Sequence, residues 1–411
     1  MSAPRFGIEK LRAWPGTLAV DIPLLCEARG LDTDNFTRRL HCSERSVVGP
    51  HEDVVTMAVN AAHPMLTAED RASIKLLIVA TESAVDQEKP LSTWVHHFLG
   101  LPSDCRNFEV KHACYGATAG LQMALGFLAS CGDPSAKALL VSTDHALIGI
   151  GGPQEPVLGA GAVAVLLSQA PEVVSYELGK SGVYAHEIAD IFRPAPGVET
   201  GDADESLLSY LDGAERTWED YVRKAGGDAH FDRNFAAHIY HVPFGGLAER
   251  AHLRLCKREL EMDRKAGLAH FRAKVEPSLI HNRRMGGTYG ASTFIALLGL
   301  VESMPSLSAN DRISIYSYGS GSCAEFYAAR LLDGARAVAE KAGLRALLDE
   351  RRMLTLSEYE ACERALHATI AARNHQADPS LLPGHFQSHY EGRGRLVYRG
   401  IADYRRTYEW S

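Results

Sequence analysis

A cysteine lies between a strand-like stretch and a helix-like stretch of the chain. Residues 109–123 read EVKHACYGATAGLQM, with Cys114 just ahead of the helical pattern. The N-terminus of a helix offers oriented N–H groups and about half a positive charge, which favours thiolate over thiol. A thiolate is the nucleophile of covalent catalysis, but free cysteines are also among the residues most often buried in cores. The stretch alone therefore leaves a catalytic and a structural role open.

Two ionisable side chains at strand ends could move or hold a proton. Glu82 follows the apolar run of SIKLLIVATES, where burial would raise the pKa of its carboxyl group toward the range that suits acid–base catalysis. His241, in YHVPFGG, ends another strand, and the proline two residues later restrains the chain there. An exposed strand-end glutamate and a hydrogen-bonded core histidine are the alternatives to these functional interpretations.

The loop YGSGS, at residues 318–322, follows a further strand and contains Ser320. Its glycines permit close approach of the backbone, and its N–H groups could form an oxyanion hole. A plain turn is the alternative for this loop taken alone. Taken together, a nucleophile, an acid–base carboxyl group, a histidine and an oxyanion-type loop predict carbon–carbon bond formation on a thioester.

Composition limits the class of protein. The chain has 411 residues, 46% of them hydrophobic, and a net charge of −8, which argues against nucleic acid as the main partner. None of its eight cysteines are paired at C-x₂-C spacing, so we expect no metal site. We find neither a signal-peptide pattern nor an apolar run long enough for a membrane span, and expect a cytoplasmic protein with free thiols that does not contact membranes.

Strand and helix patterns alternate, which predicts a layered α/β fold. In the first part of the chain we expect strands at residues 73–83, 107–113, 136–144 and 159–168. We expect one buried helix, at residues 118–130. Residues 187–235 are polar and acidic, typical of a surface excursion, and include an amphipathic helix at 209–226.

Strand and helix patterns alternate again from residue 235 onward. We expect a strand and turn, a charged helix, an apolar helix after a glycine turn, a strand–loop–helix unit, and a last strand with a polar tail, at residues 235–246, 247–267, 285–304, 312–332 and 396–411. The turn before the apolar helix echoes the turn at Cys114, which indicates two similar halves. We predict a single unit over residues 1–411, made of an N-terminal half (1–170), an excursion (171–235) and a C-terminal half (236–411).

Several stretches resemble motifs of the 3-hydroxy-3-methylglutaryl-CoA synthase family, in the same order. They are ATES, FEVKHACYGATAGLQ, GAGAVAVLL, HVPF, HNRRMGGTYGAS and YSYGSGS, and the likeness runs from about Phe6 to Tyr408. The glutamate of ATES distinguishes this family from related ketoacyl synthases. The resemblance implies a thiolase fold, in which two pseudo-duplicated α/β halves form αβαβα layers.

The resemblance also implies roles for single residues. Cys114 would be acylated by an acetyl thioester, Glu82 would remove a proton from the acetyl methyl group and act as acid in the aldol step, and His241 would orient and polarise the acceptor ketone. The expected substrate-binding residues are Phe192 of IFRP, Gly287, Tyr289 and Ser320. Neither metal nor redox cofactor is implied, and the acyl groups would arrive on CoA or on the phosphopantetheine arm of a carrier protein.

Two departures from the family pattern favour carrier proteins over free CoA. Gly287 replaces an asparagine that is usual in primary-metabolism members, and Gly245-Gly246 replaces a lysine that can meet the CoA phosphate. These changes resemble the branch that adds an acetyl-derived carbon to a β-ketone during polyketide assembly. The partners would be an acetyl-loaded donor carrier protein, an acceptor carrier protein that holds the β-ketoacyl chain, and a second copy of this chain in a homodimer.

Acidic carrier proteins would need a basic docking surface. Candidates are Arg38, Arg39, Arg45, Lys257, Arg258, Arg264 and Lys265, and a solvated charged face is the alternative. Three other functions stay open: a mevalonate-pathway synthase that uses acetyl-CoA and acetoacetyl-CoA, a thiolase or ketosynthase-type enzyme that uses Cys114 without Glu82, and a silent scaffold for carrier proteins.

Overall fold

The N-terminal half of the protein is built on a five-stranded sheet. The computed structural model describes residues 5–147, 149–195, 197–226 and 229–411. The strands of this half follow the order β1 (Gly7–Trp14), β7 (Ala160–Ser168), β6 (Lys137–His145), β4 (Ile74–Ala80) and β5 (Arg106–Val110). Strands β4, β5 and β6 are parallel, and β7 is antiparallel to both β6 and β1. The carboxyl ends of β4, β5 and β6 therefore meet at one edge of the sheet.

The C-terminal half continues the same sheet. Its strands are β12 (Ala237–Tyr240), β13 (Arg312–Gly319), β14 (Cys323–Leu331), β8 (Val174–Tyr176) and β9 (Gly182–Ala185). Strand β12 is parallel to β13, and β14 is antiparallel to β13. Strand β8 pairs with both β14 and β1, which joins the two halves into ten strands.

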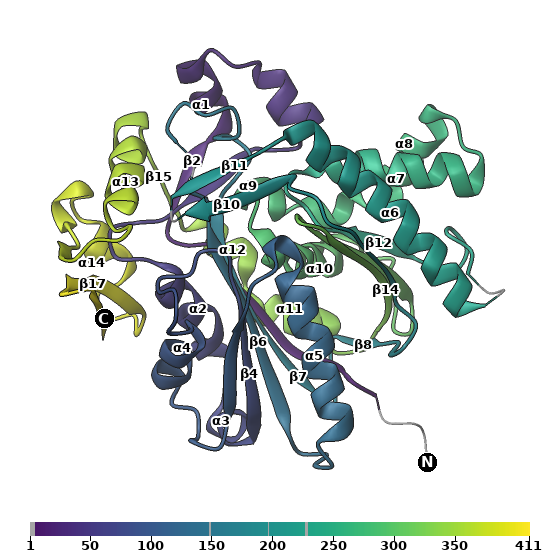
Figure 1. Ribbon diagram of the computed structural model, residues 1–411, viewed down its shortest axis with the longest axis horizontal. Coiled ribbons are helices and arrows are strands. Elements are labelled where there is room, and N and C mark those ends of the chain that lie inside the picture. The colour runs from purple at the N-terminus through teal and green to yellow at the C-terminus, as the bar shows by residue number, and fades with distance from the viewer. Residues whose placement is uncertain (1–4, 148, 196, 227–228) are drawn as a thin grey trace.

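Helices form three layers around these strands (Figure 1). Helices α5 (Gly116–Ser130) and α10 (Ser292–Ser303) share an apolar core with strands of both halves. Helices α2 (Val54–Ala62) and α4 (Ser92–Leu99) pack on the other face of the N-terminal strands, and α6 (Ala203–Ala225) and α7 (Gly245–Leu260) on that of the C-terminal strands. This layered arrangement is the expected thiolase-type fold.

The two halves repeat one local device. Short 3₁₀ turns, Ala113–Tyr115 and Tyr289–Ala291, lead into α5 and α10. Each turn contains a non-glycine residue with positive φ, Ala113 at 41° and Tyr289 at 50°. A Cβ at Gly290 would lie 3.1 Å from the Cys114 carbonyl oxygen, so the two turns touch. The echo in the sequence thus corresponds to two turns that meet at the centre of the molecule.

Smaller elements surround this core. The further strands are β2 (Leu18–Asp21), β3 (Glu44–Val47), β10 (Ile191–Ala195), β11 (Val198–Gly201), β15 (Arg352–Met353), β16 (His375–Gln376), β17 (Leu396–Ala402) and β18 (Arg405–Trp410). The further helices are α1 (Ile22–Arg29), α3 (Ala68–Ser73), α8 (Arg264–Lys274), α9 (Asn282–Met285), α11 (Ala335–Ala342), α12 (Leu344–Asp349), α13 (Leu356–Ala368) and α14 (His385–His389). Short turns of 3₁₀ or π type lie at Asn35–Arg39, His63–Met65, Glu276–Leu279 and Pro379–Leu381. Within the described ranges, every helix is too short or too polar to cross a bilayer.

Three expected elements differ from the structure. Residues 323–331 were expected to be helical but form β14, because pairing with β13, β8 and β9 outweighs the helix propensity of their alanines and leucine. The charged stretch 247–267 is divided between α7 and α8. The break occurs at Glu261, whose φ is 53°, and Asp263 caps α8 by accepting a hydrogen bond from the Ala266 N–H. The expected polar tail pairs with β17 as strand β18.

Residues 171–235 supply elements to the C-terminal half. Strands β8 and β9 pair with β14, and helix α6 packs on β9 and β14. The aromatic face of α6 is almost fully buried, with Trp218 and Tyr221 at 1% and 0% exposure. The β10–β11 hairpin lies in the same stretch and reaches the site described next.

Candidate active site

Cys114 lies in the 3₁₀ turn between β5 and α5. A Cβ at Gly319 would be only 2.5 Å from the Tyr115 nitrogen, so the 318–322 loop packs directly against this turn. The buried carboxylate of Asp190 holds the loop, because it accepts hydrogen bonds from the Tyr318 hydroxyl (2.8 Å) and the Gly321 N–H (2.9 Å). Ser320 is thereby fixed next to the cysteine turn.

The thiol of Cys114 is protonated at rest. Burial raises its pKa well above the usual value, and the negative charges of Glu82, Asp144 and Glu199 raise it further. The sequence suggested that the start of α5 would favour the thiolate. The pKa does not follow that expectation, because burial of the thiol, followed by the nearby carboxyl groups, disfavours the thiolate more than the helix end favours it.

Glu82 leaves the end of β4 and faces the same turn. One of its carboxylate oxygens accepts a hydrogen bond from the His112 N–H at 3.1 Å. Burial raises the pKa of the Glu82 carboxyl group to about 7, although the nearby charges of Lys111 and Arg193 oppose this effect. Both protonation states are therefore populated near neutral pH, as an acid–base group requires.

A second carboxyl group, Asp144, lies behind Glu82 at the end of β6. It is buried, and one oxygen accepts hydrogen bonds from the Glu82 N–H (2.7 Å) and the Ser83 hydroxyl (3.0 Å). Burial, followed by the charge of Glu82, raises the pKa of Asp144 to about 8. Asp144 fixes the backbone of the ATES turn, and sequence reasoning missed it because 62 residues separate it from Glu82.

His241 directly follows β12, and three hydrogen-bond contacts hold it. Its N–H donates to the Tyr316 carbonyl and its own carbonyl accepts from the Tyr210 hydroxyl, each at 2.7 Å. The ring Nδ1 lies 2.7 Å from the Ser292 hydroxyl at the start of α10. Burial lowers the pKa of His241 to about 3, so the imidazole is neutral. Ser292 is the last residue of the motif HNRRMGGTYGAS, but no role was predicted for it.

The β10–β11 hairpin connects Glu82 to Tyr289. Arg193 donates to the Glu82 carbonyl (2.7 Å), to the Glu199 carboxylate (2.7 Å) and to the Tyr289 hydroxyl (3.2 Å). Phe192, which was expected to line the pocket, is 45% exposed. The IFRP motif thus contributes its arginine to this network, and the sequence analysis considered only its phenylalanine.

The two glycine departures have steric causes. A Cβ at Gly287 would lie 2.8 Å from the Pro243 carbonyl oxygen, which leaves no room for an asparagine in this backbone. A Cβ at Gly246 would lie 2.3 Å from the Arg39 carbonyl oxygen, and one at Gly245 2.7 Å from the His41 Cβ. Close approach of the chain at residues 39–41 therefore excludes side chains at the start of α7.

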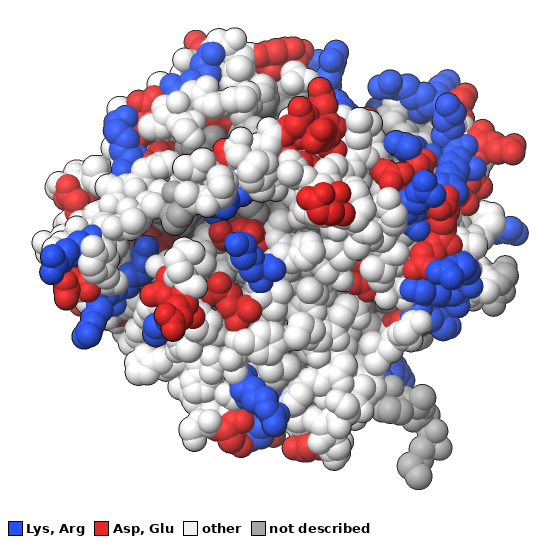
Figure 2. Space-filling model, in the orientation of Figure 1, with Lys and Arg blue, Asp and Glu red and all other residues white. Residues whose placement is uncertain are grey.

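The basic residues suggested for docking, except Arg45, lie together at one end of the molecule. Lys257, Arg258, Arg264 and Lys265 are exposed on α7 and α8, where Figure 2 shows Lys and Arg side chains gathered. Exposed Arg38 and Arg272 of α8 line the same pocket of about 290 Å³, so residues 38–39 adjoin this surface. We use the name basic end for the exposed residues of this surface, which are Arg38, Arg39, Lys257, Arg258, Arg264, Lys265 and Arg272.

Arg45 does not belong to the basic end. Its side chain is 2% exposed and forms an ion pair with the equally buried Glu363. It also donates a hydrogen bond to the Tyr359 hydroxyl at 2.7 Å. A buried guanidinium that is paired with Glu363 is not available to a docking protein, so the suggestion that Arg45 binds carriers was wrong.

Comparison with known proteins identifies the family. Sequence models for the N-terminal and C-terminal parts of hydroxymethylglutaryl-coenzyme A synthase match residues 4–172 and 257–408. The polyketide biosynthesis 3-hydroxy-3-methylglutaryl-ACP synthase PksG of Bacillus subtilis is 38% identical, over 98% of this chain and 99% of PksG. The chain is a member of the hydroxymethylglutaryl-CoA synthase family.

A second relative and several solved structures support the same family assignment. The hydroxymethylglutaryl-CoA synthase of Enterococcus faecalis is 34% identical, over 86% of this chain and 90% of its own. The crystal structure of the HMG synthase of the curacin biosynthetic pathway superposes with a TM-score of 0.94 at 37% identity, covering 99% of this chain and 100% of that one. Further structures of that curacin synthase are complexes with its donor acyl carrier protein. The fold and family inferred from the motifs are thus confirmed.

Proposed function

We propose that this enzyme condenses an acetyl group, held on Cys114, with the β-ketone of a polyketide intermediate bound to a carrier protein. The observation that carries the proposal is the placement of Glu82, whose carboxyl group has a pKa of about 7 and bonds the backbone just before Cys114. PksG is named as a polyketide HMG-ACP synthase, and the curacin synthase binds a donor carrier protein, which supports the carrier-bound form of the substrates.

The first step is transfer of the acetyl group. The sulfur of Cys114 forms a bond to the acetyl carbonyl carbon, the bond to the pantetheine sulfur breaks, and the thiol proton goes to that leaving sulfur. Because the resting thiol is protonated, the proton leaves only as the attack proceeds. Acetylation also removes the group whose ionisation the surrounding carboxylates oppose.

The second step forms the carbon–carbon bond. The Glu82 carboxylate takes a proton from the acetyl methyl group, and the N–H groups near Cys114 and Ser320 stabilise the enolate oxygen. The enolate carbon attacks the ketone carbon of the acceptor, and the protonated Glu82 returns its proton to the new alkoxide. Water then hydrolyses the thioester to Cys114 and releases the β-carboxymethyl, β-hydroxy acyl chain on its carrier.

His241 would bind the acceptor ketone through its outer ring nitrogen. The Ser292 hydroxyl accepts from the Val242 N–H (3.1 Å) and lies 2.7 Å from the His241 Nδ1. Within the described residues Nδ1 is the acceptor in reach of the hydroxyl hydrogen, which leaves the ring proton on Nε2. A neutral Nε2–H donor polarises a ketone without placing a full positive charge in this buried part of the site.

Paired substrates test the choice of carrier. Purified enzyme is given acetyl and β-ketoacyl groups either on carrier proteins or on CoA, and product is measured by mass spectrometry. We expect turnover with both carrier-bound substrates to exceed turnover with both CoA thioesters. Equal or faster turnover with CoA would favour a mevalonate-pathway synthase, and no acetylation of Cys114 by either donor would favour a scaffold.

The basic end is proposed as the docking surface for the acidic carriers. Reversing charge with Arg264→Glu and Lys265→Glu should raise KM for acetyl-carrier protein while leaving the rate with a small acetyl thioester unchanged. Arg345→Glu, at another exposed position, is the matched control. Equal effects of the basic-end and control variants would contradict docking here. We also expect a homodimer, which light scattering of the purified protein measures.

A further inference from the structure

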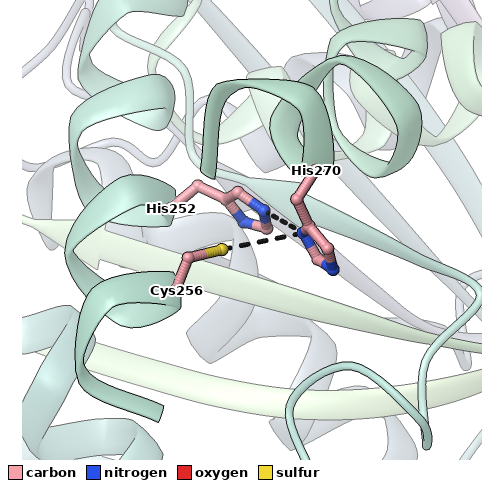
Figure 3. Close-up of side chains that lie close together, drawn as sticks. All are labelled: His252, Cys256 and His270. Atoms are coloured by element: carbon pink, nitrogen blue, oxygen red, sulfur yellow. Dashed lines mark hydrogen bonds between the residues drawn. The ribbon is translucent and has the colours of Figure 1, made fainter. Parts of the chain in front are cut away.

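Three potential metal ligands meet behind strand β12. His252 and Cys256 lie one turn apart on α7, and His270 reaches them from α8 (Figure 3). The His252 Nε2 is 2.8 Å and the Cys256 Sγ 3.6 Å from the His270 Nδ1, and all three atoms lie within 4.8 Å of one another. We call these residues the His–Cys–His cluster; they belong neither to the site around Cys114 nor to any motif singled out from the sequence.

The spacing suits a tetrahedral zinc ion. With Zn–S of about 2.3 Å and Zn–N of about 2.0–2.1 Å, tetrahedral angles put S and N about 3.6 Å apart and two N atoms about 3.4 Å apart. The observed S–N distance of 3.6 Å agrees, and the N–N distance of 2.8 Å would need to open by roughly half an ångström. Rotation of two imidazole side chains supplies a shift of that size.

Hydrogen bonds with neighbouring side chains orient the rings of His270 and His252 toward a shared centre. The His270 Nε2 lies 3.1 Å from the Asp232 carboxylate, which fixes the ring proton on that nitrogen and turns the lone pair of Nδ1 inward. The His252 Nδ1 lies 2.9 Å from the Tyr240 hydroxyl. A carboxylate behind a ligand histidine is the usual outer partner in zinc sites.

Two groups compete for the one lone pair of His270. Both the His252 Nε2 and the Cys256 Sγ point to the same Nδ1, which can accept one strong hydrogen bond. A divalent cation between the three atoms would give each of them a bond. Beside the cluster, the ring of His238 lies 5.2 Å from that of His252, and its buried Nε2 finds no partner among the described residues.

We propose that His252, Cys256 and His270 bind one Zn²⁺ ion, with a solvent molecule as the fourth ligand. Binding forms a Zn–S bond and breaks the S–H bond of Cys256, whose proton passes to water. Burial keeps this thiol protonated without a metal, since it raises the pKa to about 12. The sequence analysis expected no metal because it considered cysteine pairs, whereas this cluster joins ligands of two helices.

The role that follows is structural. His238 and Tyr240 point to the same face of β12, and both lie next to His252 of the cluster. His241 is the residue after the strand, so the alternation of side chains directs it to the opposite face. A zinc ion there would link α7 to α8, the two helices that carry most of the basic end. Chemistry at Cys114 would not require it.

Metal binding by the full-length enzyme tests the proposal. Chelator-treated protein is incubated with Zn²⁺, dialysed, and assayed for zinc by mass spectrometry, and Co²⁺ serves as a coloured probe. We expect about one zinc per chain and a near-ultraviolet thiolate-to-cobalt band. Cys256→Ala and His270→Gln should each lower zinc retention at least tenfold, whereas Cys131→Ala, at a cysteine outside the cluster, should retain it. Zinc should also raise the Tm of the unsubstituted enzyme and not that of the two cluster variants.

Controls for folding separate loss of zinc from loss of structure. Circular dichroism and acetylation of Cys114 report that a variant is folded, and His270→Gln serves if Cys256→Ala unfolds. No retained zinc in the unsubstituted enzyme would show that the cluster is a hydrogen-bonded network only. Retention that is unchanged in both cluster variants would place the metal elsewhere, and either result overturns the proposal while leaving the condensing function untouched.

Discussion

The pKa of Glu82 makes a quantitative prediction for the condensation step. Burial raises it from 4.5 to about 7, a rise of about 2.5 pH units. At about 1.4 kcal/mol per unit, the site makes ionisation of this carboxyl group about 3 kcal/mol harder than in water. If the carboxylate removes the proton, the rate should follow its ionised fraction, about a tenth at pH 6 and about nine-tenths at pH 8.

A single-turnover assay isolates this step. Enzyme acetylated at Cys114 is mixed with β-ketoacyl carrier protein, quenched at intervals, and analysed by mass spectrometry. We expect the rate to rise about tenfold from pH 6 to pH 8 with a midpoint near 7, and Glu82→Gln to remove both the pH dependence and at least about 100-fold of the rate. Acetylation of Cys114 should survive in Glu82→Gln and is the control. A rate that is flat above pH 6, or condensation near the normal rate in Glu82→Gln, would refute the assignment of Glu82 as the base.

The remaining predictions concern stability and the support of His241. Because the folded state raises the pKa of Glu82, this residue lowers the free energy of unfolding progressively as pH rises from 4.5 to about 7, and it costs nothing below pH 4.5. Glu82→Gln should therefore raise the free energy of unfolding at pH 8 by up to about 3 kcal/mol, measured by urea titration. Equal stability of the two proteins at pH 8 would contradict the burial argument. Ser292→Ala leaves the His241 Nδ1 without its partner, and we expect about 1–3 kcal/mol of destabilisation and a condensation kcat lowered about tenfold with normal acetylation of Cys114; an unchanged kcat would exclude a positioning role for Ser292. Gly287→Asn should cost about 1–3 kcal/mol by urea denaturation, since its Cβ would meet the Pro243 carbonyl oxygen, and a variant of full stability would show that the backbone yields there.

Sequence reasoning found the residues that lie beside local signals. Cys114, Glu82 and His241 each follow an apolar or β-branched run, so both the strand and its end were visible. Asp144 and Ser292 bond Glu82 and His241 directly, but their roles were not predicted, because these partners are 62 and 51 residues away in the chain. Contacts across such separations leave no mark in one sequence.

The misread elements have the same cause. Residues 323–331 contain alanine, glutamate and leucine, which favour a helix locally, yet three neighbouring strands make them β14. Pairing within a buried sheet is a non-local property, and it outweighs propensities of a few tenths of a kcal/mol per residue. The break between α7 and α8 was missed although Asp263 is a common N-cap residue type, because nothing in the sequence marks the left-handed backbone of Glu261.

The sequence by itself determined which reactive groups stand at strand ends, their order along the chain, and the family that shares this order. Only the tertiary structure decided their protonation. It buries the Cys114 thiol beside several carboxyl groups, and burial is the main reason that the thiol stays protonated. It also buries Glu82 until its carboxyl group titrates near neutral pH. Desolvation and the interaction of charges depend on distances between segments far apart in the chain, and folding alone sets those distances.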